Sequence, residues 1–219
     1  MKYFLQNKNS DYYKVVDNII KTKSKIIFDF FNSEEIEIPF NIYIYDSIKD
    51  LVSGLRSRGY TGDPDYMCAC HKDEDNSLNF FEPKGNLGEF EWLRYEYDKI
   101  IFHELIHGIQ YTLFGTTPEW INEGIAKYLD GMFDLNYILV NYINNKPIPE
   151  QYEIENEFGE HKEYDSYHYA YIMICYYIEV YGKDKLIEGL KDISKLNKDN
   201  LLIDSINYYN NIYGLNKVR

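Results

Sequence analysis

Apolar residues recur at helical spacing in most of this chain and at strand spacing near its start. Apolar positions three or four residues apart predict a long amphipathic helix over residues 10–31. Residues 36–45, IEIPFNIYIY, alternate with a period of two and are rich in β-branched and aromatic types, which predicts a strand from about 37 to 45. A capping signal at Ser47 then predicts a short helix that ends around Arg58 and Gly59.

Two further strands and a series of helices are predicted downstream. Residues 66–70 and 78–81 read as strands joined by the polar connection 71–77, which suggests a hairpin. The predicted helices are 98–111, a second that begins at Pro118 with Thr117 as its N-cap, 135–144, the strongly apolar 166–181, and two more that end near residue 213 with a polar turn at 196–200. The acidic stretch 146–165 is expected to be a charged loop or mobile flap.

The helix predicted over 98–111 contains His103-Glu104-Leu105-Ile106-His107. Residues four apart on a helix lie about 40° apart around the axis, so the two imidazoles can converge on one ion. Glu104 lies beside this pair, where its carboxylate can reach a water bound to the ion and act as a general base. The alternative is a buried helix with two hydrogen-bonded histidines.

Glu123 is the candidate third ligand. Fifteen residues separate it from His107, enough to end one helix, turn at Gly115 and run a second helix back past the first. A zinc ion held by two neutral nitrogens and one carboxylate keeps an open position for water.

HELIH followed by PEWINEGIA resembles the gluzincin zinc metallopeptidases, in which H-E-x-x-H is completed by the Glu of a W-[LI]-x-E-G-x-A helix. The resemblance implies one Zn²⁺ held by His103, His107 and Glu123, with Glu104 as general base in peptide hydrolysis. Trp120 and Gly124 would be structural. It also implies an α+β, zincin-like fold for a single domain, 1–219, with a small mixed sheet and the motif helix in residues 1–113 and a helical lobe in residues 114–219.

Peptide hydrolysis also needs a donor to the negatively charged carbonyl oxygen of the intermediate. The candidates lie just ahead of the apolar helix and are His161, Tyr164, Tyr167 and His168. The family pattern best matches Tyr167, and a tyrosine packed in the core remains the alternative. In gluzincins the edge strand of the sheet pairs with the extended substrate, and residues 78–81 have the position of that edge, although an ordinary covered edge is equally compatible. An acidic flap over the site would favour basic peptides.

The composition of the chain limits which classes of molecule it is expected to bind. A net charge of −13 argues against nucleic acid and anionic membranes, so the expected partner is a peptide or protein substrate. Three cysteines are too few and odd in number for a disulfide framework. A second metal site at Cys68, Cys70 and His71 is a minor alternative, because one residue between the cysteines is not the usual spacing of a zinc site. No export signal or 18-residue apolar stretch is found, so a cytoplasmic location is expected, although a trimmed secreted chain would look the same.

Two alternatives to the peptidase remain. A zinc-containing binding or regulatory module would keep the fold without turnover, although an intact Glu104 argues against it. A helical scaffold with coincidental histidines would bind no stoichiometric metal. The sequence lacks the G-x-M-x-N signature of aminopeptidases, which makes that subclass a weaker fit without separating endopeptidase from exopeptidase activity.

Overall fold

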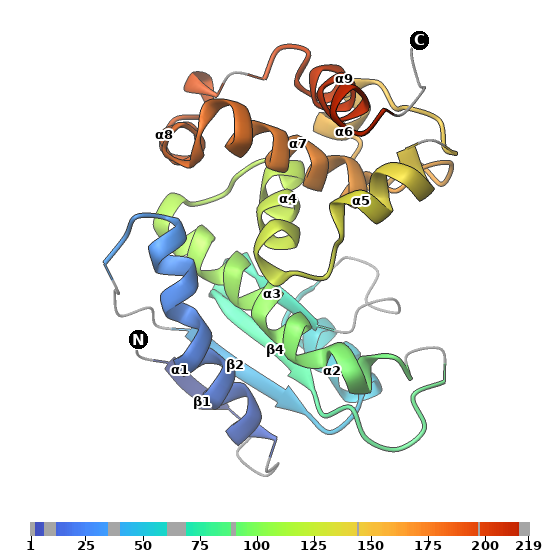
Figure 1. Ribbon diagram of the computed structural model, residues 1–219. Helices are drawn as coiled ribbons and strands as arrows, with labels where there is room; N and C mark the ends of the chain where they lie inside the picture. Colours follow the sequence, from blue (N-terminus) through green and yellow to red (C-terminus); the bar gives the residue numbers. More distant parts are fainter. Residues whose placement is uncertain are drawn as a thin grey trace. The chain divides into compact units, whose positions relative to one another are not determined.

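The computed structural model describes residues 3–6, 12–34, 40–60, 69–88, 91–143, 145–196 and 198–214. The chain divides into two compact units, residues 1–113 and 114–219 (Figure 1). The first unit contains strands and helices, and the second contains only helices among its described residues.

The first unit is built on a mixed sheet. In the described residues its four strands lie in the order β1 (Tyr3–Gln6), β2 (Phe40–Tyr45), β4 (Ser77–Phe81), β3 (Ala69–Lys72). β1, β2 and β4 are mutually parallel, and β3 is antiparallel to β4. The expected strand at 37–45 is therefore present as β2, whereas β1 was not predicted from the sequence.

The strand order corrects one prediction. Residues 78–81 were expected at the sheet edge, but β4 lies inside the sheet, where Ile42 is opposite Leu78 on one side and Cys70 is opposite Asn79 on the other. All five residues of β4 are buried, including the polar Ser77 and Asn79. Among the described strands, β3 rather than β4 is the edge on this side of the sheet.

Three helices accompany the sheet: α1 (Tyr13–Phe30), α2 (Ile48–Ser57) and α3 (Leu93–Phe114). Figure 1 shows α1 and α3 lying across the same face of the sheet. α2 packs against β2 and β4, and the Ser47 hydroxyl caps it by accepting a hydrogen bond from the Asp50 N–H at 3.2 Å. The predicted helices at 10–31 and 47–58 are thus confirmed.

The predicted hairpin is also present, with a shorter turn. β3 continues to Lys72, a 3₁₀ turn spans Asp73–Asp75, and Asn76 adopts a left-handed conformation (φ 45°) before β4 begins. Asn tolerates this conformation better than most residues, because its side chain forms local hydrogen bonds. Residues 66–68, expected to open the first strand, lie outside the described residues.

The second unit is arranged around one buried helix. Its helices are α4 (Glu119–Asp130), α5 (Leu135–Ile138) with a π-helical turn over Leu139–Ile143, α6 (Gln151–Asn156), α7 (Ser166–Tyr181), α8 (Lys183–Lys191) and α9 (Leu201–Tyr213). α7 packs against α4, α6, α8 and α9, which explains why most of its residues are apolar and buried (Figure 1). No described helix is long and apolar enough to cross a membrane.

Two boundaries in the second unit differ from the sequence prediction. α4 begins at Glu119, with Pro118 rather than Thr117 at the N-cap position. The stretch 146–165 is not a loop throughout, since it contains α6. This short helix is held by the fully buried Ile154 and by a capping box between Glu150 and Glu153, two features that its high acidic content concealed.

Gly124 marks the closest approach between α4 and α7. A Cβ atom at this position would lie 2.6 Å from Cγ1 of Ile174 and 2.7 Å from the backbone oxygen of Ala170. Only a residue without a side chain fits there. The resemblance implied a structural role for Gly124, in the approach of its helix to the motif helix, whereas the helix that Gly124 meets within the second unit is α7.

Candidate functional site

α3 carries His103, Glu104 and His107 in its most deeply buried part. Every residue from Ile100 to Gln110 is buried on this helix, and the two histidines are each 6% exposed. Glu96 lies in the first turn, where a carboxylate interacts favourably with the helix dipole. The helix thus holds these three side chains, and Gln110 as a fourth polar one, in surroundings where each needs a partner.

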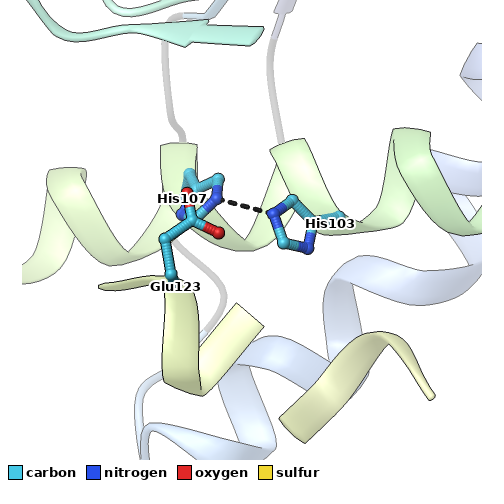
Figure 2. Close-up of side chains that lie close together, drawn as sticks. All are labelled: His103, His107 and Glu123. Carbon is cyan, nitrogen blue, oxygen red and sulfur yellow. Dashed lines mark hydrogen bonds between the residues drawn. The ribbon is translucent and has the colours of Figure 1, made fainter. Parts of the chain in front are cut away.

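The two imidazoles converge, as Figure 2 shows. The Nε2 atoms of His103 and His107 lie 2.9 Å apart, and the rings are nearly perpendicular (86°) with centroids 4.6 Å apart. Tetrahedral zinc with bonds of about 2.0–2.1 Å separates two ligand nitrogens by roughly 3.4 Å. A movement of a few tenths of an ångström would therefore let both nitrogens hold one ion.

Glu123 lies in the second turn of α4 and is the third side chain drawn in Figure 2. One ligand atom from each of His103, His107 and Glu123 lies within 4.8 Å of the other two. Two imidazole nitrogens and one carboxylate oxygen are the donors of zinc sites that keep a position open for water or substrate. The residues present therefore fit zinc.

Glu104 is held by the sheet. The backbone N–H of His71, in β3, donates a hydrogen bond of 2.7 Å to Oε2 of Glu104. This N–H points away from β4, because main-chain groups alternate between the two sides of an antiparallel strand. The bond fixes the orientation of the Glu104 carboxylate through Oε2.

The hairpin that presents His71 is itself tied to α3. The His71 ring places Nδ1 3.0 Å from Oδ1 of Asp73 and Nε2 2.9 Å from Oδ1 of Asn76. The Asn76 amide in turn donates to the hydroxyl of Thr112 on α3 at 3.3 Å. Sequence reasoning did not find this network. The one local signal was an Asn in the middle of a polar hairpin turn, which marks the turn and not its tertiary partner.

Cys70 lies near Glu104 without acting as a metal ligand. Burial first, and then the negative charge of Glu104, raise the pKa of its thiol, so Cys70 stays protonated. Both nitrogens of His71 are engaged by Asp73 and Asn76. Among the described residues neither Cys70 nor His71 belongs to a group able to hold an ion, and Cys68 lies outside them. Nothing in the described region therefore supports a second metal site here.

Tyr167 lies in the first turn of α7 and is 38% exposed. The Nζ atom of Lys127 lies 5.8 Å from the centre of its ring. Lys127 follows Glu123 by four residues on α4, so the two project from the same face of that helix. Within the second unit, Tyr167 thus lies beside the face of α4 that carries Glu123.

The other three oxyanion candidates have different surroundings. Tyr164 is 7% exposed and packs against Tyr169. Nε2 of His161 lies 2.7 Å from a carboxylate oxygen of Glu157. The remaining candidate, His168, stacks on Phe133 and Tyr142 and pairs through Nδ1 with Asp165 at 3.1 Å.

Comparison with known families identifies one relationship. The family model described as Peptidase MA superfamily matches residues 88–218, which include all of α3 and almost the whole second unit. Comparisons with curated proteins and with solved structures found no match. The matched segment covers more than half of the chain and contains both histidines and Glu123. The chain therefore belongs to the Peptidase MA superfamily.

Proposed function

We propose that this protein is a zinc-dependent peptidase that uses one zinc ion held by His103, His107 and Glu123. The observation that carries the proposal is the convergence of the two buried imidazoles on α3, with Nε2 atoms 2.9 Å apart. Membership of a peptidase superfamily supports the reaction class, and the donor set supports zinc.

Glu104 acts as general base and then as general acid. A zinc ion, when bound, supplies a Lewis acid that makes water nucleophilic near neutral pH. Glu104 accepts the proton of the attacking water on Oε1 while the N–H of His71 holds Oε2. The same carboxylate then donates this proton to the leaving amine as the peptide bond breaks. Because the bond to His71 already holds the Glu104 carboxylate in one orientation, less conformational entropy is lost at each proton transfer.

Tyr167 is assigned as the donor to the oxyanion of the tetrahedral intermediate. Its position beside the face of α4 that carries Glu123 supports this role, as does its exposure, which leaves it accessible to a substrate. Tyr164 is buried and His161 is engaged by Glu157, so both fit the role less well. A hydroxyl aimed at the developing negative charge lowers the barrier by electrostatic stabilisation.

The substrate is a peptide or protein segment in extended form. We assign its pairing to β3 in place of β4, on the side away from β4, where the main-chain groups of Ala69 point the same way as the N–H of His71 that is bonded to Glu104. The net charge of −13 favours basic over acidic peptides in diffusional encounter.

The test is digestion of a diverse peptide mixture by the zinc-loaded protein and by Glu104→Gln, with cleavage sites read by mass spectrometry. Loss of the base should reduce kcat by about 10²–10⁴-fold, while zinc content measured by inductively coupled plasma mass spectrometry stays unchanged. Glu96→Gln is the matched control. It makes the same change on α3 at a partly exposed carboxylate paired with Lys99, and should leave cleavage unaffected.

Each outcome distinguishes a rival. Cleavage by the wild type that disappears only in Glu104→Gln supports the peptidase. Bound zinc with no cleavage by any variant would shift the assignment to a non-catalytic zinc module. Absence of stoichiometric zinc in the wild type, with His107→Ala behaving identically, would refute the metal centre.

A further inference from the structure

A second group of metal-ligand side chains lies in the second unit, at the end of α6. Glu153, Glu157 and His161 follow one another at intervals of four residues. Nε2 of His161 lies 2.7 Å from Oε2 of Glu157 and 3.9 Å from Oε1 of Glu153. One ligand atom from each residue lies within 4.8 Å of the other two. None of these residues belongs to the candidate centre on α3 and α4.

The spacing of these atoms suits a small divalent cation. Metal bonds of about 2.0–2.2 Å with tetrahedral angles place ligand atoms roughly 3.3–3.5 Å apart. The two separations from His161, 2.7 and 3.9 Å, lie on either side of that value. All three side chains are half-buried, so small torsional changes, without movement of the backbone, can bring the three atoms around one ion.

The backbone orients the ligands in advance. Oε2 of Glu153 accepts a hydrogen bond of 2.7 Å from the N–H of Glu150 in the capping box, and this bond turns Oε1 toward His161. The turn after α6 is fixed by the hydroxyl of Ser166, which accepts a hydrogen bond of 3.1 Å from the N–H of Gly159. Hydrogen bonds that hold the remote atoms of a ligand are typical of metal sites.

Tyr164 provides a separate observation that points to a ligand. Its ring stacks on the imidazole of His161, with centroids 5.4 Å apart and planes 24° apart, and the residue is 7% exposed. Its buried hydroxyl faces Glu153 but lacks a hydrogen-bond partner of ordinary geometry. It is a polar group turned toward a negatively charged cluster, where it can bond to a water on the ion.

Negative charge collects around the imidazole. The carboxylates of Glu153 and Glu157 lie 3.9 and 2.7 Å from its Nε2 atom, and the charge of Glu163 also acts on it. Three carboxylates around one imidazole leave an excess of negative charge, which a divalent cation neutralises better than one proton does.

We propose that Glu153, Glu157 and His161 form a second zinc site, which clamps the end of α6 to the segment that leads into α7. One imidazole and two carboxylates are ligands that zinc accepts, and water would complete the coordination. The site is structural: the ion adds to the contacts that already join the two parts, which are the packing of α6 on α7 and the hydrogen bond from Gly159 to Ser166. It requires nothing of the reaction proposed for His103, His107 and Glu123.

Zinc titration of the full chain by calorimetry tests this site. Wild type should bind two ions and His107→Ala one. In the His107→Ala background, His161→Ala should abolish the remaining binding, and Glu157→Gln should weaken it by at least about 100-fold. Glu160→Gln is the matched control, because Glu160 is an exposed glutamate of the same turn outside the cluster, and it should bind like its parent.

Thermal unfolding gives a second readout. Zinc should raise the Tm of His107→Ala and have no effect on the His107→Ala/His161→Ala double variant, since only the native site binds the ion. If His161→Ala fails to fold, the conservative Glu157→Gln still decides the question. The proposal is overturned if His107→Ala binds no zinc, or binds it equally well after either change. If instead the centre on α3 is wrong, His107→Ala will match wild type while His161→Ala still loses one ion.

Discussion

Replacement of Gly124 by alanine tests how the second unit positions the helix that carries Glu123. The added Cβ would lie 2.7 Å from the oxygen and 3.0 Å from the carbonyl carbon of Ala170, whereas ordinary contacts begin near 3.4 Å. Backbone atoms of a buried helix cannot turn aside as a side chain can. The strain should therefore push α4 away from α7.

The expected loss of stability follows from two opposing effects. Overpacking against backbone in a well-packed core costs about 3 kcal/mol. Alanine in a helix interior is better than glycine by roughly 1 kcal/mol. The net destabilisation is about 2 kcal/mol, which for a chain of this size lowers Tm by about 4–8 °C.

Thermal unfolding followed by circular dichroism measures the change, with Gly189→Ala as the matched control. A Cβ at Gly189 would meet Cδ1 of Leu196, the end of a flexible side chain that can move. This variant should lie within about 1 kcal/mol of wild type. Because Glu123 adjoins Gly124, Gly124→Ala should also weaken zinc binding. Equal stability of Gly124→Ala and wild type would refute the packing argument.

Three further predictions concern the metal, the acid limb of stability and the hairpin. Removal of zinc by a chelator should abolish cleavage and lower Tm, and added zinc should restore both, because an ion at 100 times its Kd contributes about 2.7 kcal/mol. Burial opposes ionisation of Asp165, but its hydrogen bonds with His168 and the backbone outweigh this effect and lower its pKa. The contribution of Asp165 to stability is therefore present above the ordinary carboxyl pKa and is lost as pH falls through the lowered pKa. Asp165→Asn should flatten this loss of stability at acid pH in pH-dependent unfolding. Asp165→Ala also removes the N-cap of α7 and should cost about 1 kcal/mol of stability at neutral pH. Asn76→Ala removes the link from His71 to α3 and should lower kcat by about 10- to 100-fold in steady-state assays with little change in zinc affinity; an unchanged kcat would contradict the positioning role of the hairpin.

Local spacing determined much of what the sequence revealed. The helices at 10–31, 47–58 and 166–181 and the hairpin before β4 follow from patterns within a few residues, and the structure confirms them. The four-residue interval between His103 and His107 places both on one face of any helix that contains them. Their convergence on α3 is a consequence of helix geometry and requires no knowledge of the rest of the chain.

Tertiary structure decided what depends on distant segments. Hydrophobic alternation marks β4 as a strand but does not say which strands flank it, so its interior place became visible only once β2 and β3 paired with it. The bond from His71 to Glu104 joins residues 33 positions apart, and Gly124 meets α7 across more than 40 positions of sequence. Periodicity reports the face that a residue occupies within its own element. The element that packs against that face is selected by packing of the whole unit. Only in the whole unit must all buried polar groups find hydrogen-bond partners while all the elements pack without overlap.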